Sequence, residues 1–229
     1  FRVIYQDGSN GYTPVYIFNF GQRTFNTAPP TGYSALQQDN FPETGKGIPD
    51  LVWIKNRDAL DDHQLYDSTR GPLKVLEPSA TSVEETDSDG LQKFLKGGCQ
   101  IEDDVRINTS GESYLSWNWL ANTGVTATNT EGSEDSEVQA NQTAGFSIVK
   151  YTGTGSALTV GHGLSSAPEW IFGRTIELSG GYNWSVYHKD LTSATYYLSL
   201  NLSNAETNNS NVWGTAPSST TLTVRYLTG

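Results

Sequence analysis

The sequence predicts an all-β fold built from tandem antiparallel β-sandwich modules with little helix. Thr, Tyr, Val, Trp and Phe, which are frequent in strands, are spread among Gly, Asn, Ser and Asp at short intervals. Turn signals such as Ser88-Asp89-Gly90 and Ser179-Gly180-Gly181 separate the short apolar runs. Many short strands at this spacing are typical of a sandwich, and helical spacing of apolar residues is almost absent.

The strands are expected where apolar and polar residues alternate, or where short apolar runs lie between turns. In order, they are residues 14–21, 50–56, 63–68, 73–78, 99–104, 113–121, 134–140, 145–152, 156–164, 168–176, 182–188, 195–201 and 220–227. Asp89–Lys96 is the best candidate for a helix, because Leu91, Phe94 and Leu95 have helical spacing. It is only about two turns long, so a short helix and a non-helical segment are both open there.

An internal repeat organises these strands. The segment "PDLVWIKNR" (49–57) is echoed by "PEWIFGR" (168–174). About ten residues further on, "QLYD" (64–67) corresponds to "SVYH" (185–188), and a third strand follows in each copy. One copy has too few strands to bury both faces of a sheet alone, so two copies are expected to share a sandwich or to form two sandwiches end to end.

The repeat predicts three parts: residues 1–44, the end of a preceding module with its exit linker; residues 45–132, the first repeat; and residues 133–229, the second repeat. The first copy continues into the aromatic strand of residues 113–121, and the second stops before any counterpart. There is also no Met and no leader. We therefore expect a piece of a longer polypeptide, in which "PVYIFNFG" (14–21) is a last strand whose Phe18 and Phe20 need cover from another chain or segment.

Composition excludes several classes of protein. Against 25 Asp and Glu the chain has 14 Lys and Arg, a net charge of −11, which disfavours binding to nucleic acid or to an anionic membrane surface. No apolar run is long enough to span a bilayer, so membrane insertion is not expected. Cys99 is the only cysteine, which excludes an intrachain disulfide, and we expect it to be a small buried apolar residue.

Catalytic and metal-binding patterns are not found. The histidines, His63, His162 and His188, have no metal-ligand spacing. His162 between two glycines indicates a turn histidine bonded to the backbone, His188 a strand end, and His63 a solvated side chain. The acidic clusters, residues 58–62, 84–89 and 102–104, suit solvated loops better than calcium sites, because "ETDSDG" lacks the full calcium pattern. No carboxylate pair for glycoside hydrolysis stands out, so the sequence predicts no catalytic residue, metal or cofactor.

The aromatic residues are the remaining candidates for a binding site. Six Trp and 12 Tyr in a lightly charged β protein can stack on sugar rings. Trp117 and Trp119 face the same side of a strand, and that side is expected to be core rather than surface. Tyr182, Trp184 and Trp213 flank Gly, Ser and Asn loops, and we predict them as the exposed ligand contacts.

The motifs resemble those of a phage protein family. "IFNFGQRTF…PPTGY" resembles the closing strand of SPRY-type, concanavalin-like domains of phage virion proteins. "PDLVWIKNR", "SYLSWNWLA", "GFSIVKYTGTG" and "APEWIF" resemble a repeated domain that follows such modules in long proteins of marine and cyanobacterial phages. The resemblance implies a concanavalin- or jelly-roll-like virion component that is oligomeric, with a trimer as one open form, and it implies no catalytic residues.

The function predicted is therefore that of a non-enzymatic virion structural protein. It would be a tail-fibre or surface-appendage module on the particle surface that contributes to host attachment, with other copies of itself, other virion proteins and a host surface glycan as partners. The alternative is a carbohydrate-binding β-sandwich module of a secreted bacterial adhesin or polysaccharide-degrading enzyme. An enzyme that depolymerises polysaccharide is the third hypothesis.

Overall fold

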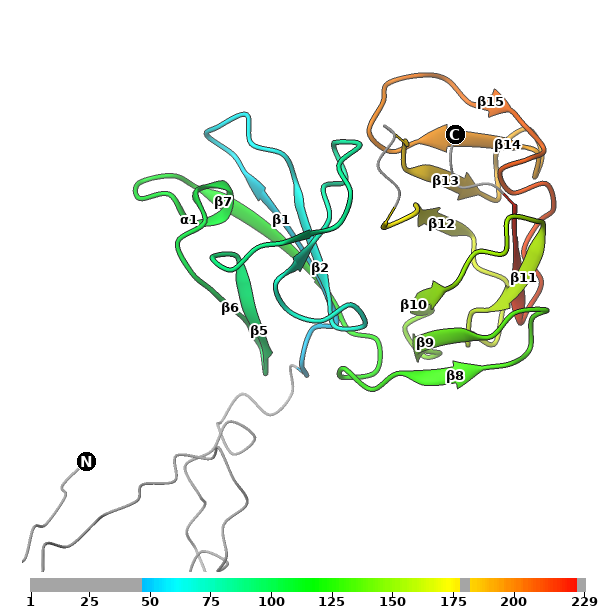
Figure 1. Cartoon of the computed structure of the whole chain (residues 1–229), viewed down its shortest axis with the longest axis horizontal. Helices are drawn as coiled ribbons and strands as arrows, with labels where there is room; N and C mark the ends of the chain where they lie inside the picture. The colour runs from blue at the N-terminus through cyan, green and yellow to red at the C-terminus, as the bar shows by residue number, and fades with distance from the viewer. Residues whose placement is uncertain (1–46, 178–181, 226–229) are drawn as a thin grey trace, which may run out of the picture. The chain divides into compact units, whose positions relative to one another are not determined.

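The computed structural model describes residues 47–177 and 182–225, and all of them belong to one compact unit of the chain (residues 45–229) (Figure 1). These residues form sixteen strands and one four-residue helix, and all ladders between the named strands are antiparallel. The expected all-β fold is confirmed. The strand expected at residues 14–21 and the module expected at 1–44 lie outside the described residues.

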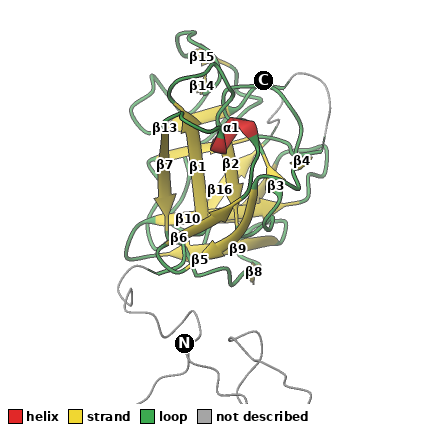
Figure 2. Cartoon of the chain, turned by 90° about the vertical axis from the view of Figure 1, so that its left-hand side faces the viewer, coloured by secondary structure: helices red, strands yellow, loops and turns green. Residues whose placement is uncertain are grey.

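The first repeat is a three-stranded sheet with two hairpins. Its elements are β1 (Leu51–Asn56), β2 (Gln64–Asp67), β3 (Lys74–Val75), β4 (Glu85–Thr86), β5 (Leu91–Leu95), β6 (Gly98–Ile101), α1 (Val105–Asn108) and β7 (Tyr114–Trp119). The sheet has the order β2-β1-β7, and its three strands lie side by side in Figure 2. β3 pairs with β4, and β5 with β6.

The strands of the second repeat lie in three small sheets. They are β9 (Ser136–Asn141), β10 (Phe146–Tyr151), β11 (Leu158–Gly161), β12 (Trp170–Gly173), β13 (Ser185–His188), β14 (Tyr196–Ser199), β15 (Thr207–Asn208) and β16 (Thr221–Val224). β8 (Ala127–Asn129), from the end of the first repeat, pairs with β9 and so joins one of these sheets. The sheet orders are β10-β9-β8, β11-β16 and β12-β13-β14-β15.

The internal repeat is present in the strand register. Leu51 pairs with Asp67 in the first copy, and Trp170 pairs with His188 in the second, so the β1–β2 and β12–β13 ladders start at equivalent positions. The third segments of the two copies also correspond. In the first copy, Leu76 forms an antiparallel bridge with Leu65 of β2, and in the second copy β14 pairs with β13. The repeated unit is therefore a three-strand antiparallel meander.

Each face of β1 enters a different apolar cluster, because successive side chains of a strand point to opposite faces. Val52 and Ile54 are buried in the first repeat with Tyr66, Val75, Leu91 and Ile107. A second cluster lies within the second repeat and contains Leu158, Val160, Tyr187, Val212, Trp213, Leu222 and Val224. The third cluster contains residues of both repeats: Leu51, Leu65, Leu76 and Trp184, with Trp53, Trp119, Phe146 and Phe172 packed against them.

Hydrogen bonds reinforce this shared cluster between the two repeats. Trp184 Nε1 donates to the carbonyl of Glu77 at 2.9 Å. Arg174 Nη2 donates to the carbonyl of Thr81 at 3.2 Å. The amide of Glu84 donates to the carbonyl of Ile176 at 3.0 Å. Because buried polar groups need partners, these bonds stabilise the contact between the loops of the two repeats.

A buried carboxylate fixes the turn that follows β7. Asp50 accepts hydrogen bonds from the amides of Ala121, Thr123 and Gly124 and from the hydroxyl of Ser68. These hydrogen bonds give the oxygens of the buried carboxylate the partners that buried polar groups need. Asp50 thereby joins the start of β1 to the chain beyond β7, on the side of β1 where β7 pairs.

Residues 89–96, the segment with helical spacing, do not form a helix. Leu91–Leu95 is β5, and it forms a hairpin with β6 through the turn at Gly97, whose φ is +79°. The hairpin buries Leu91 beside Tyr66 and leaves Phe94 and Cys99 partly buried against the same cluster, so tertiary packing overrides the local spacing. Among the described residues, no helix has the length and apolarity that crossing a membrane requires.

Candidate functional site: an aromatic surface between β7 and β12

A row of aromatic rings extends from β7 to β12 at the boundary between the two repeats. The ring centroids of Trp117 and Trp53 are 6.0 Å apart, those of Trp53 and Phe172 are 6.1 Å apart, and those of Phe172 and Trp170 are 5.2 Å apart. The two ends are open to solvent, with Trp117 40% and Trp170 50% exposed. We call these four residues, with His63, the aromatic surface.

Strand register explains why these rings meet. Trp117 is the β7 partner of Trp53 on β1, and cross-strand partners lie on the same face of a sheet. Phe172 occupies in β12 the position that Trp53 occupies in β1, since Pro49 and Pro168 begin the equivalent segments. The two equivalent residues contact one another, so the two sheets face each other across the aromatic surface.

His63 is held in its neutral form at one side of this surface. Trp53 Nε1 donates a hydrogen bond of 2.8 Å to His63 Nδ1, and the two rings meet edge to face with centroids 5.7 Å apart. Burial and the nearby Lys55 ammonium lower the pKa of His63, while Asp62 opposes them. Since Nδ1 accepts the bond from Trp53, its protonation would remove that contact. His63 is therefore half-buried and bonded, and the prediction of a solvated side chain is wrong.

The aromatic surface has the chemistry of a binding surface. Exposed indole faces stack on sugar rings or on apolar side chains, and Trp is a common anchor residue at protein interfaces. Trp117 and Trp170 offer such faces, while Trp53 and Phe172 between them are supported from below by the shared apolar cluster. A rigid, partly exposed row of rings can bind a flat or extended partner without ordering long side chains.

The aromatic residues predicted as exposed contacts lie elsewhere. Trp184 and Trp213 are each only 3% exposed, so their predicted exposure is wrong, and Tyr182 is half-buried. Trp184 packs in the shared cluster with the Arg174 guanidinium 5.4 Å above its ring. Trp213 lies in the core of the second repeat, 6.4 Å from Tyr187. The loops that flank both residues are polar, but their indoles turn inward because each fills an apolar cluster.

Sequence reasoning missed the residues that are exposed. Trp117 and Trp119 do share a face, and only Trp119 is covered, by a stacked contact with Phe146 at 6.3 Å. Trp170 was not singled out, although one signal pointed to it. Trp170 occupies the position of Leu51 in the first repeat. A large Trp in place of a Leu, which is buried, indicates that the surroundings of this position differ between the repeats.

Part of the acidic clusters is engaged in ion pairs around Arg106. Its guanidinium contacts Glu77 at 3.1 Å, Asp87 at 3.2 Å and Asp104 at 3.1 Å. Burial would raise the pKa of Asp104, but hydrogen bonds from the Arg106 amide and side chain outweigh it and lower that pKa. Burial raises the pKa of Asp87. A second arginine, Arg70, pairs with Asp67 and Glu84. The prediction of solvated loops is therefore wrong for Glu84, Asp87 and Asp104.

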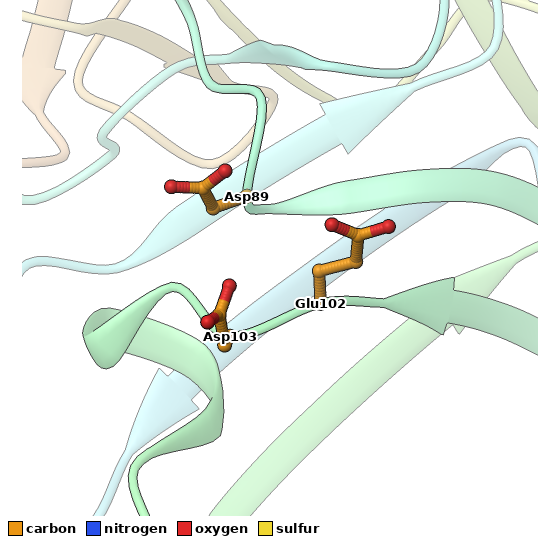
Figure 3. A group of neighbouring side chains, drawn as sticks. All are labelled: Asp89, Glu102 and Asp103. Atoms are coloured by element: carbon orange, nitrogen blue, oxygen red, sulfur yellow. The ribbon is translucent and has the colours of Figure 1, made fainter.

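Three further carboxylates could hold a cation but are exposed. Asp89 lies in the turn before β5, Glu102 directly follows β6 and Asp103 lies before α1 (Figure 3), with oxygens within 4.8 Å of one another. Calcium takes six to eight oxygen ligands, and exposed carboxylates are well solvated without an ion. No function is assigned to this group.

The other predicted residues have structural surroundings. His162 is buried in its turn, where Nδ1 accepts a bond of 3.1 Å from the Leu164 amide, which confirms a turn histidine bonded to the backbone. Burial lowers the pKa of His162, although a backbone bond to Ser218 opposes this. His188 ends β13, as expected. Cys99 is partly buried, and burial raises the pKa of its thiol.

Comparison with known proteins gives one match. The sequence matches the family described as a domain of unknown function (DUF7483) over residues 24–228. Neither the curated proteins nor the solved structures give a match.

Proposed function

This chain belongs to the DUF7483 family, and we propose that it is a non-enzymatic structural module of a phage virion. In this proposal it forms part of a tail fibre or another surface appendage that contributes to host attachment. It is located on the particle surface and assembles with other copies of itself and with other virion proteins. The resemblance of its motifs to repeated domains of phage proteins supports this role.

The observation that carries the proposal is the repetition of one β meander, packed on itself through equivalent residues. Trp53 and Phe172 contact each other, and Trp184 packs among Leu51, Leu65 and Leu76 of the other repeat. Successive β modules that share a core hold a binding tip at a fixed distance from the particle, while their loops can vary without disturbing that core. This is the mechanical requirement of an appendage.

The state of the titratable groups favours a structural role over catalysis. Arg70 and Arg106 pair with partly buried carboxylates, and His63 and His162 accept structural hydrogen bonds. A general acid or base needs a side chain that faces a substrate and is not used in this way. The carboxylates of these pairs serve the fold.

Mass spectrometry of purified virions tests this role directly. The chain should be detected in particles of the phage that encodes it, and the recombinant chain should elute as a multimer in light-scattering chromatography. Immunogold labelling should place it on an appendage, and the purified chain should slow adsorption of the phage to its host. A stable monomer that is missing from virions would overturn the proposal.

Exposed Trp117 and Trp170 favour a second candidate function, a carbohydrate-binding module of a secreted adhesin or polysaccharide-degrading enzyme. An isolated monomer would then bind a glycan array, and Trp117→Ala or Trp170→Ala would each weaken binding by about five-fold, since one indole stack contributes roughly 1 kcal/mol. Leu202→Ala, which removes another exposed apolar side chain away from these rings, is the matched control. Equal binding by all three variants would exclude this candidate.

A further inference from the structure

The two repeats differ at one edge of the meander. In the first repeat, β1 pairs with β2 on one side and with β7 on the other. In the second repeat, β12 pairs with β13, and no strand of the described part of the chain pairs with its other side. We refer to that side as the open edge of β12.

The open edge of β12 has backbone amides and carbonyls that point away from β13 and can bond to another strand. Lys189 donates its amide to the carbonyl of Glu169, which marks a hydrogen-bonded pair at the start of the β12–β13 ladder. Since such pairs alternate along an antiparallel ladder, Ile171 points its amide and carbonyl to β13 while Trp170 and Phe172 point theirs to the open edge. Their counterparts in the first repeat are Leu51 and Trp53, which have Trp119 and Trp117 of β7 as partners.

The side chains at the open edge of β12 are more exposed than their counterparts in β1, which lie beside β7. Leu51 is 6% exposed beside β7, and its counterpart Trp170 is 50% exposed. Asp50 binds the turn after β7, whereas its counterpart Glu169 is exposed and pairs with Lys189 at 2.7 Å. Within the described part of the chain, Trp170 and Glu169 thus lack the strand and the turn that Leu51 and Asp50 contact in the first repeat, and both are exposed.

β12 has only part of the usual protection against strand addition. Edge strands of native proteins are protected by shortness, charges, prolines or bulges that hinder pairing with other chains. β12 is short, with four residues, but its sequence Trp-Ile-Phe-Gly has no charge or proline, and its ladder with β13 has a continuous register. In contrast, the edge strand β10 carries the exposed Lys150.

We propose that the open edge of β12 binds an extended strand of another polypeptide. The first repeat defines the chemistry of that strand: like β7, it is uncharged and carries large aromatic side chains at alternate positions. It pairs antiparallel with Trp170 and Phe172, and one of its rings lies on Phe172 as Trp117 lies on Trp53. Because Trp53 and Phe172 face each other, the added strand lies opposite β7 and covers the exposed faces of Trp117 and Trp170.

A synthetic peptide with the sequence of residues 113–121, capped at both ends and flanked by lysines for solubility, is the probe. Amide exchange is followed by NMR in the free and peptide-saturated chain. The amides of Trp170 and Phe172 are expected to exchange quickly in the free chain and at least ten-fold more slowly with peptide, because the peptide carbonyls accept them. The amide of Ile171, already bonded to β13, should change little.

N-methylation of the peptide gives a control that leaves the protein unaltered. In β7, Trp117 points its amide to β1 and Asn118 points its amide away, given the bonded pair of Arg57 and Ser113. A peptide N-methylated at the position of Trp117 should therefore lose binding. One N-methylated at the position of Asn118 should keep it within about two-fold.

Variants of the protein complete the test. Trp170→Lys, which places a charge at the edge, should weaken peptide binding by about ten-fold or more, and Leu202→Lys, an exposed apolar site elsewhere, should not. Peptide binding does not depend on a role in virions, so the two proposals can fail separately. Unchanged exchange at Trp170 and Phe172, or equal binding of both N-methylated peptides, would overturn the inference. A free chain that is monomeric and already protected there would also overturn it, because the chain itself would then cover the edge.

Discussion

The two repeats begin with the same strand pair and end in different surroundings. In the first repeat, β7 covers one edge of β1, and the turn behind β7 is held by the buried carboxylate of Asp50. In the second repeat, β12 has an open edge beside the exposed Trp170. The meander therefore forms with or without a fourth strand such as β7. The fourth strand determines which residues of the neighbouring strand are exposed to solvent.

Removing the indole that joins the two repeats should have the largest effect. Trp184→Ala leaves a cavity among Leu51, Leu65 and Leu76 and removes the bond to the Glu77 carbonyl. We expect the free energy of unfolding to fall by about 3–5 kcal/mol in denaturant titrations. Trp170→Ala is the control for loss of an indole at the surface. A loss below about 1 kcal/mol for Trp184→Ala would mean that the repeats are stable independently of their shared cluster.

Equivalent positions at the edge should respond unequally. Leu51→Ala, in the buried edge beside β7, is expected to cost about 2–4 kcal/mol, while Trp170→Ala should stay within about 1 kcal/mol of the parent. Thermal and chemical unfolding of the two variants measure the difference. Equal losses would show that the open edge of β12 is covered in solution and would remove the basis of the comparison.

Arg106, in the first repeat, should contribute to stability in a pH-dependent way. Arg106→Ala leaves Glu77, Asp87 and Asp104 without their cation, at a cost of about 2–3 kcal/mol near neutral pH. The pKa of Asp104 is lowered in the folded chain, so its contribution is present above the unfolded pKa and is lost as pH falls through the folded one.

The difference between the parent and Arg106→Ala should therefore be largest near pH 7 and shrink toward pH 3. Lys150→Ala, which breaks the exposed pair with Glu137, is the control and should cost no more than about 0.5 kcal/mol. A difference for Arg106→Ala that does not vary with pH would assign its effect to lost packing alone.

Acidification should have the smallest effect, through one histidine in each repeat. His63 and His162 both have a pKa below the ordinary value because of burial, so the fold favours their neutral forms. Their contribution is full above the unfolded pKa of about 6.5 and is lost as pH falls below it toward the folded pKa values.

We expect melting temperature to fall by about 2–4 °C between pH 7.5 and pH 5.5, and by less in His63→Gln. His188→Gln, at an exposed strand end, is the control. A fall in His63→Gln as large as in the parent would mean that the bond between His63 and Trp53 does not transmit pH to the aromatic surface.

Much of the fold was predictable because its strands repeat. The alternation in "DLVWIKN" and the echo "PEWIF" predicted β1, β12 and their partners, and the register confirms the equivalence. Residues 89–96 were not predictable as β5, since their spacing fits a helix and only the hairpin with β6 and burial of Leu91 decide for a strand. Local sequence does not contain that long-range contact.

The candidate site was less predictable than the fold. A Trp between Gly, Ser and Asn gives no sign of which way its indole turns, and Trp184 and Trp213 turn inward to fill two different clusters. Trp117 and Trp119 lie on the same face of β7. This face is covered at Trp119, which stacks on Phe146, and exposed at Trp117. The exposure of these indoles depends on whether another strand packs over them. The alternation of apolar and polar residues along one strand does not contain that information.

The contact between Trp53 and Phe172 also bears on the origin of the molecule. A two-fold homodimer places a residue against its own counterpart, and these two residues are counterparts. A shorter ancestor with one meander could make the same contact with a second molecule of itself. Duplication within one gene would turn that encounter into a tethered one that no longer depends on protein concentration. Each half could then change independently of the other. The equivalent positions Leu51 and Trp170, which now hold different residues, are an example.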